Sequence, residues 1–188
     1  MKKLSLIFLI AAMFIFTVST ATLAQVPGYW DLKAGLDFGG KIDIDGAYGS
    51  DDVDTGLTLI GEYKVPYRNG WTLGGGLRYQ LDREIDASGD PEFSFMPIYA
   101  LAEYDFMNNP YYMFGQLGYN TFDMDNLPGY SVDDTSGGLY YAVGAGMDLS
   151  NTMTAEVMYS VNNGEADLNG NSEDLDYSKL TVSLGVKF

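Results

Sequence analysis

The C-terminal stretch YSKLTVSLGVKF, residues 177–188, decides the fold. Its apolar side chains occupy every second position, and polar or small residues fill the positions between them. The apolar set is Leu180, Val182, Leu184, Val186 and Phe188, and the other set is Lys179, Thr181, Ser183, Gly185 and Lys187. Because successive side chains of a strand point to opposite faces, this pattern predicts a β-strand with one apolar and one polar face. If the strand belongs to a larger sheet, the rest of the chain must repeat its design.

Residues 1–24 are predicted to be a cleaved secretory signal peptide. Lys2 and Lys3 form a basic start, residues 4–18 are almost wholly apolar, and residues 22–24 form a small-residue cleavage site. The mature chain, residues 25–188, is then one domain with no cysteine and therefore no lipid-anchored N-terminus or disulfide. Removing the two lysines leaves 10 − 2 = 8 basic residues against 26 acidic ones, a net charge of 8 − 26 = −18. Such a surface repels nucleic acid and attracts cations.

Seven further segments show the same alternation of apolar and polar residues. They are residues 29–44, 55–65, 71–82, 93–106, 111–121, 138–149 and 153–162. Long, mostly acidic connections (45–54, 83–92, 122–137 and 163–176) alternate with short ones (66–70, 107–110 and 150–152), and Asn69-Gly70 is a strong hairpin signal. Pro97 predicts a bulge or weakened pairing within its strand. An even strand number with alternating long and short connections predicts an all-β fold, an eight-stranded antiparallel up-and-down transmembrane β-barrel.

Aromatic residues gather at the two ends of the predicted strands. One group lies at the short-turn end: Trp30, Tyr63, Tyr67, Trp71, Tyr104, Phe106, Tyr111 and Phe188. The other lies towards the long loops: Tyr79, Tyr119, Tyr141, Tyr159 and Tyr177. Two such girdles are typical of a barrel whose apolar face meets lipid, and the glycines on the polar face suit a narrow interior.

On these features the mature chain resembles the OmpA/OmpX-like family of eight-stranded outer-membrane β-barrels, the porin-family small barrels. The terminal strand, with Leu180, Val182, Leu184, Val186 and Phe188, resembles the assembly signal of that family. The resemblance implies export across the Gram-negative envelope, handling by periplasmic chaperones and the barrel-assembly machinery, and residence in the cell outer membrane. It also implies a monomer in contact with outer-membrane lipid.

Charges of both signs on the polar face predict an ion-pair network inside the barrel. The charged residues on this face are Lys33, Glu62, Lys64, Arg78, Glu103, Asp105, Glu156, Lys179 and Lys187. The candidate members of the network are Glu62, Arg78, Glu103, Glu156 and Lys179, with Arg78 and Lys179 expected on neighbouring strands. Buried charges are costly unless paired, so the network has two interpretations: a structural plug of salt bridges, or a rearrangeable gate for ions. OmpA-type barrels have an interior charge cluster of this kind.

The acidic long loops predict contact with lipopolysaccharide through divalent cations, since clustered carboxylates suit hard cations. Asp167, Asn169, Asn171 and Glu173 resemble a calcium loop faintly, but the glycine is misplaced and strands rather than helices flank it, so no dedicated metal site or cofactor is predicted.

The chain contains no histidine and no cysteine, which removes Ser-His-acid and Cys-His catalysis. We therefore expect a barrel that is not an enzyme and that has a structural or surface-interaction role through its acidic extracellular loops. The alternative is a narrow pore or a conduit for ions or small hydrophobic molecules, gated by the interior network.

Overall fold

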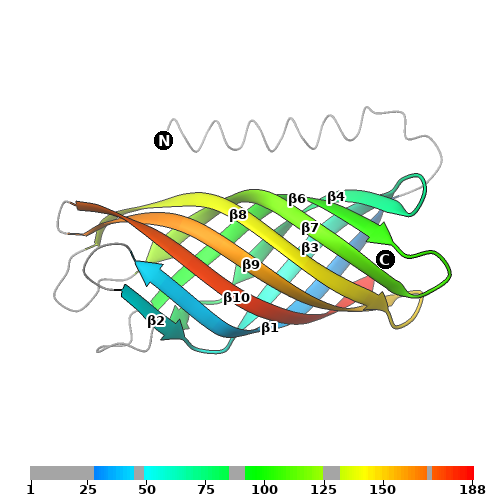
Figure 1. The fold of residues 1–188 in the computed structure, drawn as a ribbon, viewed down its shortest axis with the longest axis horizontal. Coiled ribbons are helices and arrows are strands. Elements are labelled where there is room, and N and C mark those ends of the chain that lie inside the picture. The colour runs from blue at the N-terminus through cyan, green and yellow to red at the C-terminus, as the bar shows by residue number, and fades with distance from the viewer. Residues whose placement is uncertain (1–27, 45–48, 85–91, 125–131, 169–170) are drawn as a thin grey trace.

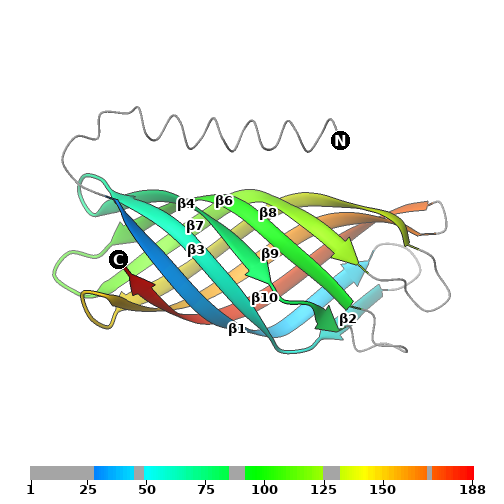
Figure 2. The same cartoon turned by 180° about the vertical axis from the view of Figure 1, so that it is seen from behind.

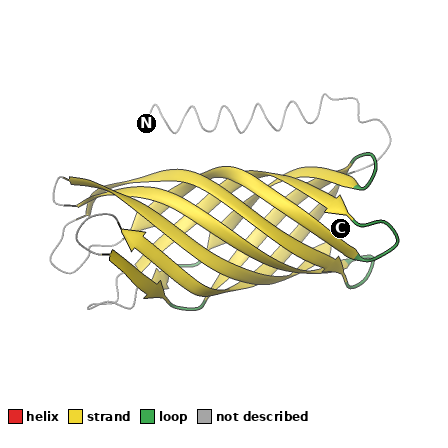
Figure 3. Cartoon of the chain, viewed as in Figure 1, coloured by secondary structure: helices red, strands yellow, loops and turns green. Residues whose placement is uncertain are grey.

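The computed structural model describes residues 28–44, 49–84, 92–124, 132–168 and 171–188, which form a closed antiparallel sheet (Figure 1). The predicted signal peptide, residues 1–24, lies outside these ranges. None of the described segments is a helix of the length and apolar character needed to cross a membrane. Strands and the turns between them make up the whole described chain (Figure 3).

Eight long strands build the wall, and two short strands extend it. The bounds are β1 (Tyr29–Ile44), β2 (Gly49–Val53), β3 (Gly56–Pro66), β4 (Trp71–Gln80), β5 (Arg83–Glu84), β6 (Glu92–Asp105), β7 (Tyr111–Met124), β8 (Val132–Asp148), β9 (Met153–Leu168) and β10 (Asn171–Lys187). The long strands pair in chain order, and β10 pairs with β1 to close the barrel (Figures 1 and 2). Trp30 and Phe188 exchange backbone hydrogen bonds of 2.9 and 3.0 Å at this closure. The predicted eight-stranded barrel is confirmed, with β2 and β5 as additions at its rim.

The two faces of the wall have opposite chemistry. On β10 the apolar set Leu180, Val182, Leu184 and Val186 points outward, and Val182 is 44% exposed. The alternate residues Lys179, Thr181 and Ser183 are buried inside the barrel. An apolar outer belt around a polar interior suits a barrel surrounded by lipid, because the same apolar surface would be unfavourable in water.

The hairpin between β3 and β4 has the tight turn that its sequence predicts. Asn69 and Gly70 both have positive φ, 58° and 80°, as a type I′ turn requires at its two central positions. The short turns all lie at one end of the barrel, called the short-turn end below (Figure 1). The other end, where the strands lead into the predicted long connections, is called the long-loop end.

A bulge at Gly39 reverses the two faces of β1. The register of β1 against β10 shifts between Phe38 and Lys41, and Gly39 has a φ of 56°, in the left-handed region that glycine tolerates. Beyond the bulge Lys41 points outward and Ile42 is buried. The unbroken alternation predicted for residues 29–44 would put Ile42 on the face of Trp30 and Lys41 on the other. It is wrong beyond Phe38, because the extra residue shifts the side-chain alternation by one.

The ladder between β4 and β6 stops at Pro97. Its regular pairs run from Trp71↔Tyr104 to Leu77↔Ile98, and the next pair is Arg83↔Phe93. Asp105 N donates to Gly70 O, so odd-numbered residues of β6 aim their N–H groups at β4. Arg78 and Pro97 would form the next hydrogen-bonded pair, and proline has no N–H to donate. The predicted weakening is confirmed on this side, whereas the β6–β7 register continues through Pro97↔Asn120 without a bulge.

Strands extend into segments expected to be loops. β2 lies in 45–54, β5 in 83–92, and the ends of β7 and β8 lie in 122–137. The hairpin of β9 and β10 continues in register from Asn163↔Asp176 to Leu168↔Asn171. These segments were predicted to be loops because they are acidic. Acidic residues occupy outward positions in them, and the two-residue alternation of a strand continues.

The interior of the long-loop end is filled with apolar side chains. We call this group the aromatic plug; it comprises Ile42, Val53, Phe93, Phe95, Phe122, Leu175 and Tyr177, all of them buried. The rings of Phe95 and Phe122 stack with centroids 4.7 Å apart, and Phe93 meets Tyr177 edge-on at 5.0 Å. Tyr177 was expected in the outer girdle; that expectation is wrong, because Tyr177 shares the inward face of Lys179, two residues further on. The polarity of the barrel is thus inverted at this end, with an apolar inside and an acidic outside.

Candidate functional site

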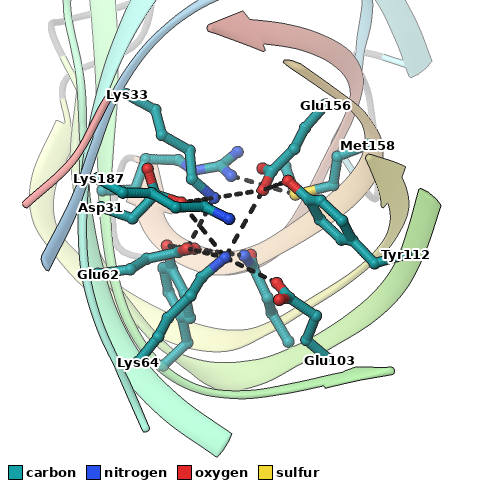
Figure 4. A network of polar contacts seen from close by, with 12 residues as sticks. Asp31, Lys33, Glu62, Lys64, Glu103, Tyr112, Glu156, Met158 and Lys187 are labelled. Atoms are coloured by element: carbon teal, nitrogen blue, oxygen red, sulfur yellow. Dashed lines mark hydrogen bonds and ion pairs between the residues drawn. The ribbon is translucent and has the colours of Figure 1, made fainter. Parts of the chain in front are cut away.

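Four strands bring charged side chains together inside the short-turn half of the barrel. This acidic lumen cluster consists of Asp31 and Lys33 on β1, Glu62 and Lys64 on β3, Glu103 on β6, and Glu156 on β9 (Figure 4). Lys33 Nζ lies 2.7 Å from Glu62 Oε2 and 2.6 Å from Glu156 Oε1. Lys64 Nζ lies 2.7 Å from Glu103 Oε2 and 3.3 Å from Asp31 Oδ2. The two ammonium groups therefore join strands that do not pair with each other, β1 with β9 and β3 with β6.

Neutral side chains on β6 and β7 donate hydrogen bonds to two of the carboxylates, Glu62 and Glu156. The Tyr99 hydroxyl donates to Glu62 Oε1 at 2.9 Å, and Gln116 Nε2 donates to the same oxygen at 3.0 Å. The Tyr112 hydroxyl donates to Glu156 Oε1 at 2.9 Å. Behind them lies a packed apolar group on β6 to β9, formed by Tyr99, Leu101, Tyr112, Phe114, Tyr140, Ala142 and Met158. The lumen therefore has a charged wall and an aromatic wall.

A second group of charges lies nearer the long-loop end, around Asp37. Lys179 Nζ and Arg83 Nη2 lie 2.7 and 2.8 Å from Asp37 Oδ2. The Thr58 and Thr181 hydroxyls donate to the same carboxylate at 2.5 and 2.7 Å. Lys179 also donates to the Gln80 side-chain oxygen. We call this group, Asp37, Thr58, Gln80, Arg83, Lys179 and Thr181, the Asp37 cluster.

The five predicted network residues are divided by the structure. Glu62, Glu103 and Glu156 lie together in the acidic lumen cluster, whereas Lys179 belongs to the Asp37 cluster. Arg78 is buried but forms no salt bridge with a described carboxylate. Arg78 and Lys179 were expected on neighbouring strands; that is wrong, because β3 and β1 lie between β4 and β10.

Sequence reasoning left three central residues out of the network. Asp31 and Asp37 lie on the inward face of β1, and the alternation that identified Lys33 as an inward residue applies to both. Arg83 had no such signal, since its segment was expected to be a loop. Its inward position follows from the two-residue strand β5, which pairs with Phe93.

Three buried carboxylates approach each other as closely as metal ligands do. Oxygens of Asp31, Glu62 and Glu156 lie within 4.8 Å of one another. Lys33 Nζ contacts all three, at 3.6, 2.7 and 2.6 Å, so an ammonium group already accounts for their approach. Of the four residues that faintly resemble a calcium loop, Asn169 lies outside the described residues, and the hairpin register puts Asp167 and Glu173 on opposite faces.

The chain resembles two solved outer-membrane barrels. Ail, the attachment invasion locus protein of Yersinia pestis, is 15% identical with a TM-score of 0.56, over 87% of this chain and 100% of Ail. Neisserial surface protein A is also 15% identical, with a TM-score of 0.55, over 86% of this chain and 99% of that protein. No curated protein matches the sequence significantly.

The family model of the outer membrane protein beta-barrel domain matches residues 8–188. The chain therefore belongs to this family, and its place is the cell outer membrane. The apolar outer belt is then the lipid-facing surface, and the long-loop end is the extracellular one.

Proposed function

We propose that this barrel has a structural and surface-interaction role, in which an acidic collar above the outer leaflet binds lipopolysaccharide phosphates through divalent cations. The collar is the outward face of β1, β9 and β10 at the long-loop end: Asp43, Glu165, Asp174 and Asp176, all exposed. It lies on the same face of β10 as Leu180 and Val182, beyond the apolar belt. Carboxylates at that level face the headgroup region rather than the hydrocarbon of the membrane.

The main support for the proposal is that carboxylates of the collar lie directly opposite each other on neighbouring strands. Asp43 pairs with Asp176 across β1 and β10, and Asp174 pairs with Glu165 across β10 and β9. Such pairs destabilise a sheet unless something neutralises them. Divalent cations such as Mg²⁺ and Ca²⁺, which prefer oxygen ligands, would neutralise these pairs and would also bridge them to phosphate. The aromatic plug packs inside the barrel at the same end, and the strand pairing places the collar carboxylates side by side.

The net charge of −16 argues for a cation-bridged ligand rather than direct binding of a polyanion. Ail has been crystallised with the heparin analogue sucrose octasulfate, a polyanion. The collar of this chain is acidic, and we expect it to bind sulfated sugars poorly unless Mg²⁺ or Ca²⁺ is present.

Retention of lipopolysaccharide tests the proposal. The folded barrel is mixed with lipopolysaccharide in detergent, and co-purifying lipopolysaccharide is measured in Mg²⁺ and in EDTA. We expect EDTA to release it, and Asp43→Asn with Asp176→Asn to weaken retention several-fold in Mg²⁺. The matched control is Asp54→Asn with Asp82→Asn, which removes two exposed carboxylates outside the collar. The proposal would be overturned if the amount of co-purifying lipopolysaccharide were the same in EDTA as in Mg²⁺ and the same in the collar variant as in the wild type.

A second candidate, a conduit for ions or small hydrophobic molecules, has one specific observation in its favour. The wall is unpaired between Leu77↔Ile98 and Arg83↔Phe93, next to the charged interior. The aromatic plug argues against it, since it fills the long-loop end. Planar-bilayer recordings separate the two: defined channels that change in Glu156→Gln support a gated conduit, and a silent bilayer containing folded protein supports the closed barrel.

A further inference from the structure

Arg78 is a buried cation with open hydrogen-bonding positions. Its side chain is 1% exposed and crosses the lumen from β4 to β9, where Nη2 lies 3.1 Å from the Met158 sulfur. Its guanidinium lies 5.8 Å from the centre of the Tyr140 ring. Nε and Nη1 have no hydrogen-bond partner among the described residues. A thioether and a ring face do not neutralise an arginine in a low-dielectric interior.

The tyrosines and carboxylates that act electrostatically on Arg78 have hydrogen-bond partners elsewhere. The Tyr140 hydroxyl donates to Gln116 Oε1 at 2.6 Å, and the Tyr99 hydroxyl donates to Glu62. Both carboxylate oxygens of Asp37 already accept hydrogen bonds within the Asp37 cluster. Nε and Nη1 of Arg78 thus make no hydrogen bond to any of these oxygens and stay open to a ligand.

Other open donors surround the same region. Gln80 follows Arg78 on the inward face of β4, and its Nε2 has no partner in the described part of the chain. The Gln80 oxygen accepts from Lys179, and Lys179 pairs across the sheet with Ser160, whose hydroxyl is also unpartnered there. Ser160 is two residues from Met158, the contact of Arg78. Three buried, unpartnered donors thus come from β4 and β9 to one level of the barrel.

The charge count of the lumen favours a negative ligand at this level. Five carboxylates and five basic side chains are buried among the described residues, so the interior as a whole is neutral. The acidic lumen cluster holds four carboxylates and two lysines, a net charge of −2. Arg78 and the Asp37 cluster hold three cations and one carboxylate, a net charge of +2. Arg78 and Arg83 both repel the Lys179 ammonium at this end.

We propose that the lumen binds a small monovalent inorganic anion of halide size at Arg78. Nε and Nη1 of Arg78 and Nε2 of Gln80 would donate to it, the Ser160 hydroxyl would turn towards it, and Lys179 would add attraction. A cation is excluded by the excess positive charge. Tyr99, Tyr140 and Met158 crowd the site, which selects a compact ion over a tetrahedral oxyanion. The site is independent of the acidic collar and of its proposed ligand.

Bromide replaces chloride and is visible by anomalous diffraction, so it is the probe. Crystals of the folded barrel grown or soaked in bromide should show an anomalous peak beside Arg78 and Gln80. The thermal unfolding midpoint in detergent should be higher in chloride or bromide than in gluconate at equal ionic strength, because gluconate is too large for the site. Arg78→Met should remove both effects. Lys41→Met, which removes one outward-facing positive charge, is the matched control and should retain them.

Two results overturn the proposal. One is a wild-type map with no anomalous peak in the lumen, which decides the matter even if Arg78→Met does not refold. The other is a halide-dependent midpoint that shifts equally in Arg78→Met and Lys41→Met, which would place the halide effect outside the lumen. A peak beside Arg78 that is lost in Gln80→Leu would support the donor set named above.

Discussion

At the scale of single residues, the interior of this barrel depends on a few ammonium groups. Lys33 holds Glu62 from β3 and Glu156 from β9 at 2.7 and 2.6 Å, so one side chain joins strands on different sides of the lumen. A buried pair of this kind contributes little net stability by itself, but removing one partner leaves the other as an uncompensated charge.

Lys33→Met should therefore destabilise the barrel by about 3–5 kcal/mol, the usual cost of breaking a buried ion pair. Urea-induced unfolding from lipid vesicles measures it. Lys41→Met makes the same chemical change on the outer face and should stay within about 0.5 kcal/mol of the wild type. Equal midpoints for the two variants would mean that water in the lumen screens these charges.

The outer face of β10 allows a residue-scale test of where the hydrocarbon begins. Val182→Arg puts a charge into the apolar belt and should cost about 2–4 kcal/mol if the residue lies near the bilayer midplane. Ser178→Arg makes a comparable change on the same face of the same strand, at the edge of the belt, and should cost much less. The measurement is the difference between the unfolding free energies of the two variants. If Val182→Arg left the free energy of unfolding unchanged, this face would lie in water.

At the scale of elements, the two irregularities of the wall have different causes. The β1 bulge depends on the backbone freedom of Gly39, which has a φ of 56°. The β4–β6 gap depends on a missing donor at Pro97. The sequence pattern could predict the second, because proline is visible as a non-donor. It could not predict the first, because Gly39-Gly40 is compatible with a regular strand as well as with a bulge. The extra residue is evident only from the pairing with β10.

Pro97→Val should extend the β4–β6 ladder by one hydrogen-bonded pair with Arg78. The amide protons of Arg78 and Gln80 should then exchange more slowly, by roughly fivefold, the ratio that about 1 kcal/mol per hydrogen bond gives. Hydrogen exchange followed by NMR in detergent measures this. Pro110→Ala, in the short turn before β7, should leave both amides unchanged. Unaltered exchange in Pro97→Val would mean that something other than the missing donor separates these strands.

At the scale of the whole molecule, the alternation of apolar and polar residues was sufficient to predict the barrel, its strand order and its lipid-facing surface. The same alternation did not predict the strands at the long-loop end, because there the outward residues are acidic and the inward residues are apolar. Leu180 and Asp176 share one outward face, but the first meets lipid and the second meets water. Phe95 and Tyr177 face inward, as Lys179 does, but pack against each other. Pairing of charges across the lumen depends on barrel closure, so the sequence could identify Glu62 and Glu156 as inward residues but not Lys33 as their shared partner.

Barrel closure and the predicted assembly signal meet at one residue, Phe188, where they can be tested separately. Phe188 exchanges backbone hydrogen bonds with Trp30, which joins the last strand to the first, while its ring stays exposed at the short-turn end. Deleting Phe188 should impair assembly but would remove both features at once. Phe188→Ala keeps the backbone and removes only the ring, so it tests the predicted assembly signal alone.

We expect Phe188→Ala to lower the folded fraction in the outer membrane of cells several-fold, measured by heat-modifiable mobility on a gel. The same variant should refold into lipid vesicles at nearly the wild-type yield, because both closing hydrogen bonds remain. Phe188→Tyr, which retains an aromatic ring at the interface, is the control and should assemble normally. Equal loss in cells and in vesicles would make Phe188 a stability residue, and no loss in either would leave the ring without a role in assembly.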